Sequence, residues 1–221
     1  MKIGILSDVH ANVYALKTVL EQLKREGIEI ILHAGDLVGY NPTPAAVITT
    51  FQAEGISTIQ GNHDAAVVGN WTENSSELMD RSTQWTRNQL DETDLLYLQN
   101  LPESMTVEYD GITIHIVHGS PQSQGEYIYP DDITETLIGD EDVLVFGHTH
   151  YPIVSSLSTG LLINPGSVGH PRDSNLDPSF AILDTDTLPV SLQRVSYSRD
   201  IVQRKIKKSD LPTEISKHIE K

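Results

Sequence analysis

The order of segments in the first sixty residues constrains the fold of this chain most strongly. Three apolar runs alternate with two stretches whose apolar side chains recur at helical spacing, in the order 2–6, 11–26, 29–34, 44–54 and 56–60. Gly27 and Gly55 follow the two helical stretches, as is typical of helix C-termini. A strand–helix–strand–helix–strand order predicts βαβ units and therefore a parallel sheet.

The rest of the chain predicts a second sheet and further helices. Runs over 104–109 and 112–117 flank Asp110-Gly111, which is typical of a hairpin turn. Further strands are predicted at 143–146, 153–157, 161–164, 179–183 and 190–195. Residues 66–101 are predicted to form two or three helices as a cap or insertion, and residues 199–221 a helical tail. The predicted fold is α/β, with two packed sheets and helices outside, in a single domain over 1–221.

Charge and composition narrow the function classes. The 221 residues carry 31 acidic and 15 basic side chains, a net charge of -16, which argues against duplex nucleic acid or an anionic membrane as partner. The chain has no cysteine, so thiolate metal sites and cysteine nucleophiles are excluded. The first residues lack the features of a signal peptide, and no apolar run reaches the ~20 residues of a membrane helix. We therefore expect a cytoplasmic protein.

Short clusters of Asp, Asn and His follow five of the apolar segments. They are Asp8-Val9-His10, Gly35-Asp36, Gly61-Asn62-His63-Asp64, His118-Gly119 and Gly147-His148-Thr149-His150. The glycines before Asp36, Asn62 and His148 permit tight turns that would bring the ligands into a crevice beyond the strand ends. Oxygen and imidazole ligands without thiolates suit manganese, iron, zinc, nickel or cobalt.

In this order the clusters resemble the motifs of the calcineurin-like metallophosphoesterase superfamily. The later Asn164-Pro165-Gly166-Ser167-Val168-Gly169 resembles its small bacterial and archaeal phosphodiesterase branch. The resemblance implies a four-layer αββα sandwich of two mixed sheets. It implies one metal ion held by Asp8, His10, Asp36 and His150, and a second held by Asp36, Asn62, His118 and His148, with Asp36 as the bridge. His63 matches the histidine that faces the scissile phosphate and assists the leaving oxygen.

These residues predict a two-metal phosphohydrolase that acts on phosphodiesters more than on monoesters. Two divalent ions ~3.5–4 Å apart can clamp phosphate oxygens, and they lower the pKa of a bound water toward ~7, which supplies hydroxide. Manganese is the expected metal. The expected substrate is a small phosphoester or a nucleotide, because Tyr127 and Tyr129 are placed to stack on a base. No substrate-binding residue is assigned.

Three alternatives stay open on the sequence: a Ser/Thr protein phosphatase, a dinucleoside polyphosphate hydrolase, and a non-catalytic scaffold like the retromer subunit. Protein phosphatases of the superfamily carry an acidic residue and an arginine where this chain has Gly39 and Tyr40, which disfavours that activity. The scaffold function is disfavoured because metal-ligating residue types are present at all seven ligand positions. A homodimer is the default assembly for relatives of this size.

Other polar and aromatic residues receive structural interpretations. Asn12 is predicted to cap the first helix, and an ion pair on the surface is favoured over a phosphate contact for Arg172. Packing is predicted for His33 and His115, exposure to solvent for His218, and anchoring of the cap helices for Trp71 and Trp85.

Overall fold

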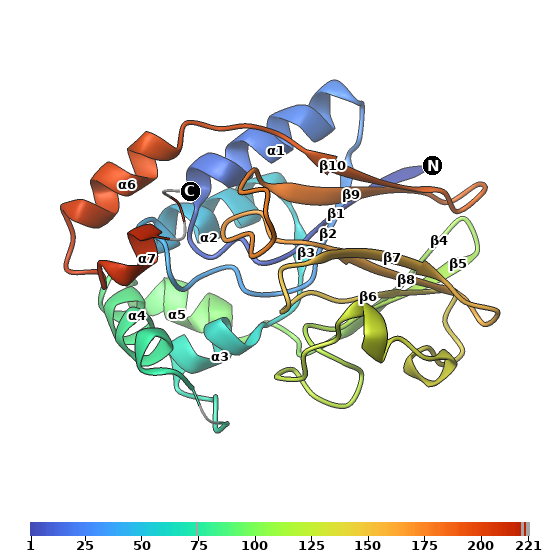
Figure 1. Cartoon of the computed structure of the whole chain (residues 1–221), viewed down its shortest axis with the longest axis horizontal. Coiled ribbons are helices and arrows are strands. Elements are labelled where there is room, and N and C mark those ends of the chain that lie inside the picture. The colour runs from blue at the N-terminus through green and yellow to red at the C-terminus, as the bar shows by residue number, and fades with distance from the viewer. Residues whose placement is uncertain (74, 218, 220–221) are drawn as a thin grey trace.

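Two mixed β-sheets of five strands face each other in the computed structural model (Figure 1), which describes residues 1–73, 75–217 and 219. In the first sheet, of order β10-β9-β1-β2-β3, strands β1, β2 and β3 are parallel, and β9 pairs antiparallel with β1 and β10. Its strands are β1 (Lys2–Leu6), β2 (Ile30–His33), β3 (Ser57–Thr58), β9 (Ser179–Asp184) and β10 (Val190–Arg194). The βαβ prediction for the first sixty residues is confirmed.

The second sheet has the order β4-β5-β6-β8-β7. Strands β5, β6 and β8 are parallel, and the antiparallel strands β4 and β7 lie at the two edges. The strands are β4 (Met105–Tyr109), β5 (Ile112–Ile116), β6 (Val143–Val145), β7 (Pro152–Ser156) and β8 (Leu161–Pro165). The predicted hairpin around Asp110-Gly111 is confirmed as β4–β5.

Alternating side chains of the first sheet build two separate cores. In β9, Ala181 and Leu183 pack with side chains of the second sheet, whereas Phe180 and Ile182 pack against the helices. Successive side chains of a strand point to opposite faces, so a strand buried on both faces reads as a continuous apolar run. This explains why strands β1, β2 and β9 lack the polar alternation of a half-exposed strand.

Helices α1 (Val13–Arg25) and α2 (Pro44–Glu54) cover the outer face of the first sheet (Figure 1). The Ala15 N–H donates to the Asn12 side chain over 3.1 Å, so the predicted helix cap is confirmed. Helices α6 (Arg199–Lys207) and α7 (Glu214–Lys217) form the described part of the C-terminal tail and pack around Tyr40. His218 lies outside the described residues.

Residues 66–101 contain the end of α3 (Asn62–Val68) together with α4 (Glu77–Asn88) and α5 (Glu92–Gln99). The predicted helical character is confirmed, while the role of this segment as a cap stays a prediction. None of the helices in the described ranges combines the length and hydropathy needed to span a bilayer.

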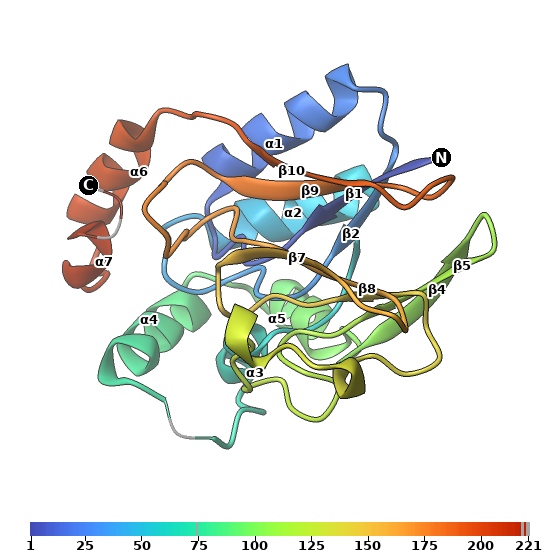
Figure 2. The same cartoon turned by 45° about the vertical axis from the view of Figure 1, so that its right-hand side comes forward.

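The outer face of the second sheet is covered by residues 120–142, which contain two short 3-10 helices, η1 (Pro130–Asp132) and η2 (Glu135–Leu137). Figure 2 shows this yellow-green segment on the side of the second sheet away from α1. Ile128 and Ile138 pack there against Phe146 and Leu162. The sandwich fold class is confirmed, with irregular chain and 3-10 turns rather than long α-helices over this sheet.

Candidate metal centre

The structure brings all seven predicted ligands together at one end of the two sheets. Each follows a strand: Asp8 and His10 follow β1, Asp36 follows β2, Asn62 begins α3 after β3, His118 follows β5, and His148 and His150 follow β6. Their side chains are buried, with at most 6% of any residue exposed. Parallel strands end at the same edge of a sheet, which explains why residues 140 positions apart meet here.

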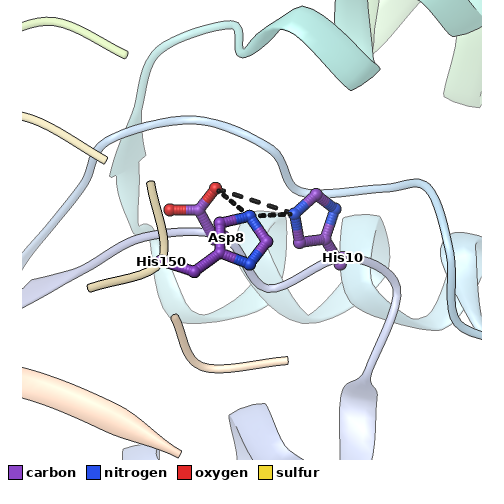
Figure 3. Close-up of side chains that lie close together, drawn as sticks. All are labelled: Asp8, His10 and His150. Atoms are coloured by element: carbon purple, nitrogen blue, oxygen red, sulfur yellow. Dashed lines mark hydrogen bonds and ion pairs between the residues drawn. The ribbon is translucent and has the colours of Figure 1, made fainter. Parts of the chain in front are cut away.

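The first cluster consists of Asp8, His10 and His150 (Figure 3). The Nε2 atoms of the two histidines lie 3.0 Å apart, and each also faces Asp8 Oδ1, at 3.6 Å from His10 and 3.2 Å from His150. The Nδ1 atoms face the backbone carbonyls of Val38 and His170, which can only accept hydrogen bonds. Each neutral ring therefore carries its proton on Nδ1, and two Nε2 lone pairs and a carboxylate oxygen converge. Such a group of acceptors fits a cation.

The second cluster is built around His118 in the same manner. His118 Nδ1 donates to the Ala34 carbonyl over 2.7 Å, so its Nε2 lone pair faces Asn62 Oδ1 at 3.0 Å and Asp36 Oδ2 at 3.3 Å. Those two oxygens are also acceptors. Three acceptors again converge without a proton between them in the neutral state of the ring.

His148 joins this second cluster through its other ring nitrogen. Its Nε2 faces the Gly125 carbonyl at 3.2 Å, which leaves the Nδ1 lone pair toward Asn62 Oδ1 at 3.1 Å. His148 is thus held by the 120–130 loop, whereas His118 is held by the end of a strand.

Asp36 lies between the two clusters. Its Oδ2 is 3.6 Å from His10 Nε2 and 3.3 Å from His118 Nε2. Its Oδ1 accepts a hydrogen bond from the backbone N–H of His63 over 2.8 Å. Within the described part of the chain, Asp36 Oδ2 and Asp8 Oδ1 are buried without a hydrogen-bond donor. Buried carboxylate oxygens without donors are costly unless a cation satisfies them. The residues present therefore fit bound metal.

The electrostatics of the clusters agree with this geometry. Burial raises the pKa of the Asp8 and Asp36 carboxyls, but the surrounding histidines outweigh it and hold each pKa well below its usual range. Burial lowers the pKa of His118, but the charges on Asp36 and Asp8 raise it by more. The resulting pKa is about 9, above the usual value of a histidine. Burial lowers the pKa of His148 to about 3 and of His150 to about 4. The carboxylates of the two clusters are thus anionic, and their negative charge favours the binding of a cation.

The backbone of the ligand loops is left-handed at unusual positions. Five of the seven predicted ligands have positive φ angles: Asp8 at 54°, His10 at 46°, Asp36 at 62°, His148 at 65° and His150 at 61°. Non-glycine residues rarely adopt this conformation, and where they do the strain is often part of a functional site. No sequence pattern indicated it.

The glycines near the ligands act in two ways. Gly35 has a φ of 90°, as the predicted tight turn requires. Gly61 instead has a φ of −96°, and a Cβ atom there would lie 2.2 Å from Asp36 Oδ1. Gly61 is therefore required by close approach rather than by its conformational freedom.

Asp64 is a positioning residue that the sequence analysis did not assign. Its carboxylate accepts the backbone N–H groups of Asp36, Leu37, Val38 and Gly61 at 2.9, 3.2, 3.0 and 3.0 Å. It ties the turn that presents Asp36 to the start of α3. Burial and the nearby charge of Asp36 raise the pKa of Asp64 to about 7, against the lowering effect of these hydrogen bonds.

The Asn164–Gly169 stretch supports the ligand loops from behind. The Asn164 amide donates to the Gly147 carbonyl over 2.8 Å and to Thr149 Oγ1 over 2.9 Å. Ser167 Oγ donates to the Asp8 carbonyl over 2.7 Å. These bonds fix the two turns that carry Asp8, His148 and His150.

His63 lies beside the clusters at the start of α3. Its ring centroid is 4.8 Å from that of His10 and 4.4 Å from that of Tyr40, and burial holds its pKa well below the usual value. A Cβ atom at Gly39 would lie 2.6 Å from His63 Nδ1. Gly39 and Tyr40, the two positions that differ from the protein phosphatases, are therefore the residues that shape the surroundings of His63.

A cavity of about 220 Å³ opens beside these residues. Asp36, Asn62, His63, His148 and His150 line it. Tyr127, predicted to contact the substrate, lines it as well, together with residues that were not predicted there, namely Tyr40, Trp71, Met79 and Arg172. Trp71 precedes α4 and lines the cavity, and its role as a helix anchor stays a prediction. Trp85 does pack against the cluster formed by α6 and α7.

The prediction that Arg172 forms an ion pair on the surface is also wrong. Arg172 is half-buried and lines the cavity, and no ion pair joins it to a carboxylate of residues 1–73, 75–217 or 219. Asp173 pairs with Arg194 instead.

His33 and His115 pack away from the two clusters, as predicted. His33 is buried, its Nδ1 lies 2.8 Å from Thr58 Oγ1 and its ring meets Phe51. His115 Nδ1 lies 2.8 Å from Thr106 Oγ1 across the β4–β5 hairpin.

Comparisons with known proteins agree with this geometry. The family model described as the calcineurin-like phosphoesterase superfamily domain matches residues 1–188. A crystal structure of a metallophosphoesterase from Sphaerobacter thermophilus is 33% identical, with a TM-score of 0.84 over 99% of this chain and 98% of that one. An uncharacterised protein of Methanocaldococcus jannaschii is 30% identical over 231 residues, 95% of this chain and 93% of its own. A phosphodiesterase of the same organism is 27% identical over 187 residues, 84% of this chain and 94% of its own.

Proposed function

This chain belongs to the calcineurin-like phosphoesterase superfamily and is a metal-dependent phosphoesterase, and we propose that it hydrolyses phosphodiesters with two divalent cations. The observation that carries the proposal is the pair of acceptor clusters that share Asp36 Oδ2. The similarity to relatives named as phosphodiesterases supports diesters as the substrate class.

The proposed ligand sets follow the two clusters. Asp8, His10, Asp36 and His150 would hold one ion, and Asp36, Asn62, His118 and His148 the other. The convergence of lone pairs supports these sets. Manganese is our first expectation, and iron, zinc, nickel and cobalt suit the same mixture of carboxylate, amide and imidazole ligands.

When bound, the two cations supply positive charge for the phosphate oxygens and lower the pKa of water toward ~7, which makes hydroxide available. The chain arranges the reactants around them. Asp36 Oδ1 accepts a hydrogen bond from the backbone N–H of His63 over 2.8 Å, which fixes the start of α3 against the clusters. His63 lines the cavity, and its imidazole N–H would support the departure of the leaving oxygen.

Aromatic rings next to the cavity support a nucleotide as substrate. The Tyr127 ring lies 4.1 Å from the His148 ring and nearly parallel to Tyr129, with centroids 6.1 Å apart and an angle of 7°. Tyr129 is in turn 6.1 Å from Tyr151. These tyrosines are 44%, 43% and 39% exposed, so their faces are open to a base. The substrate we propose is a small diester with a base on this aromatic row.

The direct test is turnover of bis-p-nitrophenyl phosphate with manganese. We expect hydrolysis by the wild-type chain and a loss of about 100- to 10,000-fold in the His63→Ala variant, the range for a removed acid–base group. Activity of the wild type no higher than that of His63→Ala would contradict the proposed function. A panel of cyclic nucleotides, dinucleoside polyphosphates and phosphopeptides then separates the substrate classes.

A further inference from the structure

Arg172 is a cation in the lining of the cavity. It lies in the loop between β8 and β9, is half-buried, and forms no ion pair with any residue the structure describes. Arg194 on β10, by contrast, pairs with Asp173 and donates to the carbonyls of Asn175 and Asp177. Two arginines of one region thus have opposite surroundings, one neutralised and one open to the cavity.

Two phenol groups lie beside the Arg172 guanidinium in the cavity. Its side chain interacts with the side chains of Tyr127 and Tyr40, which also line the cavity. Burial raises the pKa of Tyr40, so its phenol stays neutral and lies beside Arg172 without cancelling its charge. Tyr40 is fixed in turn, because its ring stacks on His170 at 4.6 Å and packs against the cluster of α6 and α7.

Arg172 shares the cavity with the proposed reaction centre. His63, His150 and Asp36 line this cavity together with Arg172. A phosphate bound at the clusters would therefore share the cavity with the guanidinium.

A half-buried guanidinium without a counter-ion is costly unless an anion joins it. It carries five N–H donors in a planar fork, more than two phenol oxygens use. The spacing of the fork matches two oxygens of one phosphate, which gives a bidentate pair of charge-assisted hydrogen bonds.

We propose that Arg172, beside Tyr40 and Tyr127 in the cavity lining, is an anion-binding subsite that grips the non-bridging oxygens of the substrate phosphate. The proposal rests on the proposed function, because it takes the cavity to be the place where the phosphoester binds. It adds a substrate-binding residue from the β8–β9 loop to the ligands on the other loops.

The test compares Arg172→Ala with Arg194→Ala, which removes the ion pair with Asp173 from the same loop. We expect Arg172→Ala to lower kcat/KM for bis-p-nitrophenyl phosphate by roughly 10- to 100-fold, the loss of a hydrogen bond to a charged group. Calorimetry on the manganese-loaded chain should show a similar rise in the Kd for inorganic phosphate. Arg194→Ala should change both by less than about threefold, because this partly buried ion pair lies outside the lining of the cavity.

Chemical rescue separates a binding role from a structural one. Millimolar guanidinium ion should restore part of the activity of Arg172→Ala and should not raise the activity of the wild type. If Arg172→Ala does not fold, Arg172→Lys serves instead, and we expect a weaker loss because charge remains without the fork.

Unchanged phosphate affinity in the Arg172 variant would overturn the proposal. So would equal losses in the Arg172 and Arg194 variants without rescue, because the arginine would then only hold the loop. If the wild type hydrolyses no diester, the proposed function fails, and phosphate calorimetry still decides the subsite.

Discussion

The two halves of the candidate metal centre are built differently. Asp8, His10 and His150 all have left-handed backbone and are at most 1% exposed, and the two imidazoles donate to the backbone carbonyls of Val38 and His170. In the other half, apart from the shared Asp36, only His148 has a positive φ, and it is held through Gly125 of a surface loop. The first half is therefore rigid and strained, and the second depends on a helix start and a loop.

This difference predicts unequal metal affinities. Residues in sparsely populated backbone conformations cost of order 1–3 kcal/mol each, and such strain persists only where the surroundings enforce it. A site whose ligands are already enforced loses less freedom when an ion binds. We infer that the half with Asp8, His10 and His150 binds its ion more tightly, and that the second ion exchanges more readily.

The largest expected effect comes from the residue that both halves share. Asp36→Asn should lower kcat/KM by about 1,000-fold or more, because the amide removes the charge between the two ions and weakens both, and residues that act as a unit have such effects. The measurement is hydrolysis of bis-p-nitrophenyl phosphate with manganese. The matched control is His33→Gln, a buried histidine three residues earlier, which should lose little. If both variants behave alike, the bridging assignment is wrong.

Variants of one ligand in each half test the comparison itself. His150→Ala should weaken the tighter of two manganese-binding events by more than the 10- to 100-fold typical of residues that only support a ligand. His148→Ala should weaken the second event and leave the first nearly unchanged. Isothermal titration of the metal-free chain with manganese measures both. Loss of the tighter event in His148→Ala would contradict the difference in rigidity.

Asp64 tests how the shared turn is held. Asp64→Asn should lower the free energy of unfolding by about 2–3 kcal/mol, because the amide replaces a buried carboxylate oxygen that accepts backbone N–H groups. Urea denaturation of the metal-free chain measures it. The control is Asp91→Asn at the exposed start of α5, where asparagine caps as well as aspartate, so a change near zero is expected. Equal changes would mean that Asp64 does not hold the turn.

The smallest effect is expected on the aromatic row beside the second half. Tyr129→Ala should raise the KM for a nucleoside p-nitrophenyl phosphodiester by about 5- to 10-fold, near the lower end of the loss of one stacked base. Methyl p-nitrophenyl phosphate, which lacks a base, should be hydrolysed as before. Equal changes with both substrates would show that the row does not contact the base.

Residue order along the chain predicted most of this centre. Asp8, Asp36 and His148 each follow an apolar strand, and the ends of parallel strands share an edge, so their convergence follows from the strand pattern. The left-handed backbone at these residues was not predictable, since Asp and His adopt it only rarely, although more often than most residues, whereas glycine adopts it readily.

What the sequence could not reveal depends on contacts between distant segments. Asp173 stands beside Arg172, yet it pairs with Arg194, and this choice is made by the packing of β10 against the loop. Residues 120–142 show no helical or strand periodicity, so their 3-10 turns over the second sheet could not be inferred from spacing.

The number of ions bound per chain tests the central claim most directly. The purified chain is stripped of metal, equilibrated with manganese, freed of excess ion and analysed by mass spectrometry for metal content. We predict two manganese ions per wild-type chain and no more than one in Asp36→Asn. Fewer than one ion in the wild type, or the same content in both proteins, would contradict a two-metal centre bridged by Asp36.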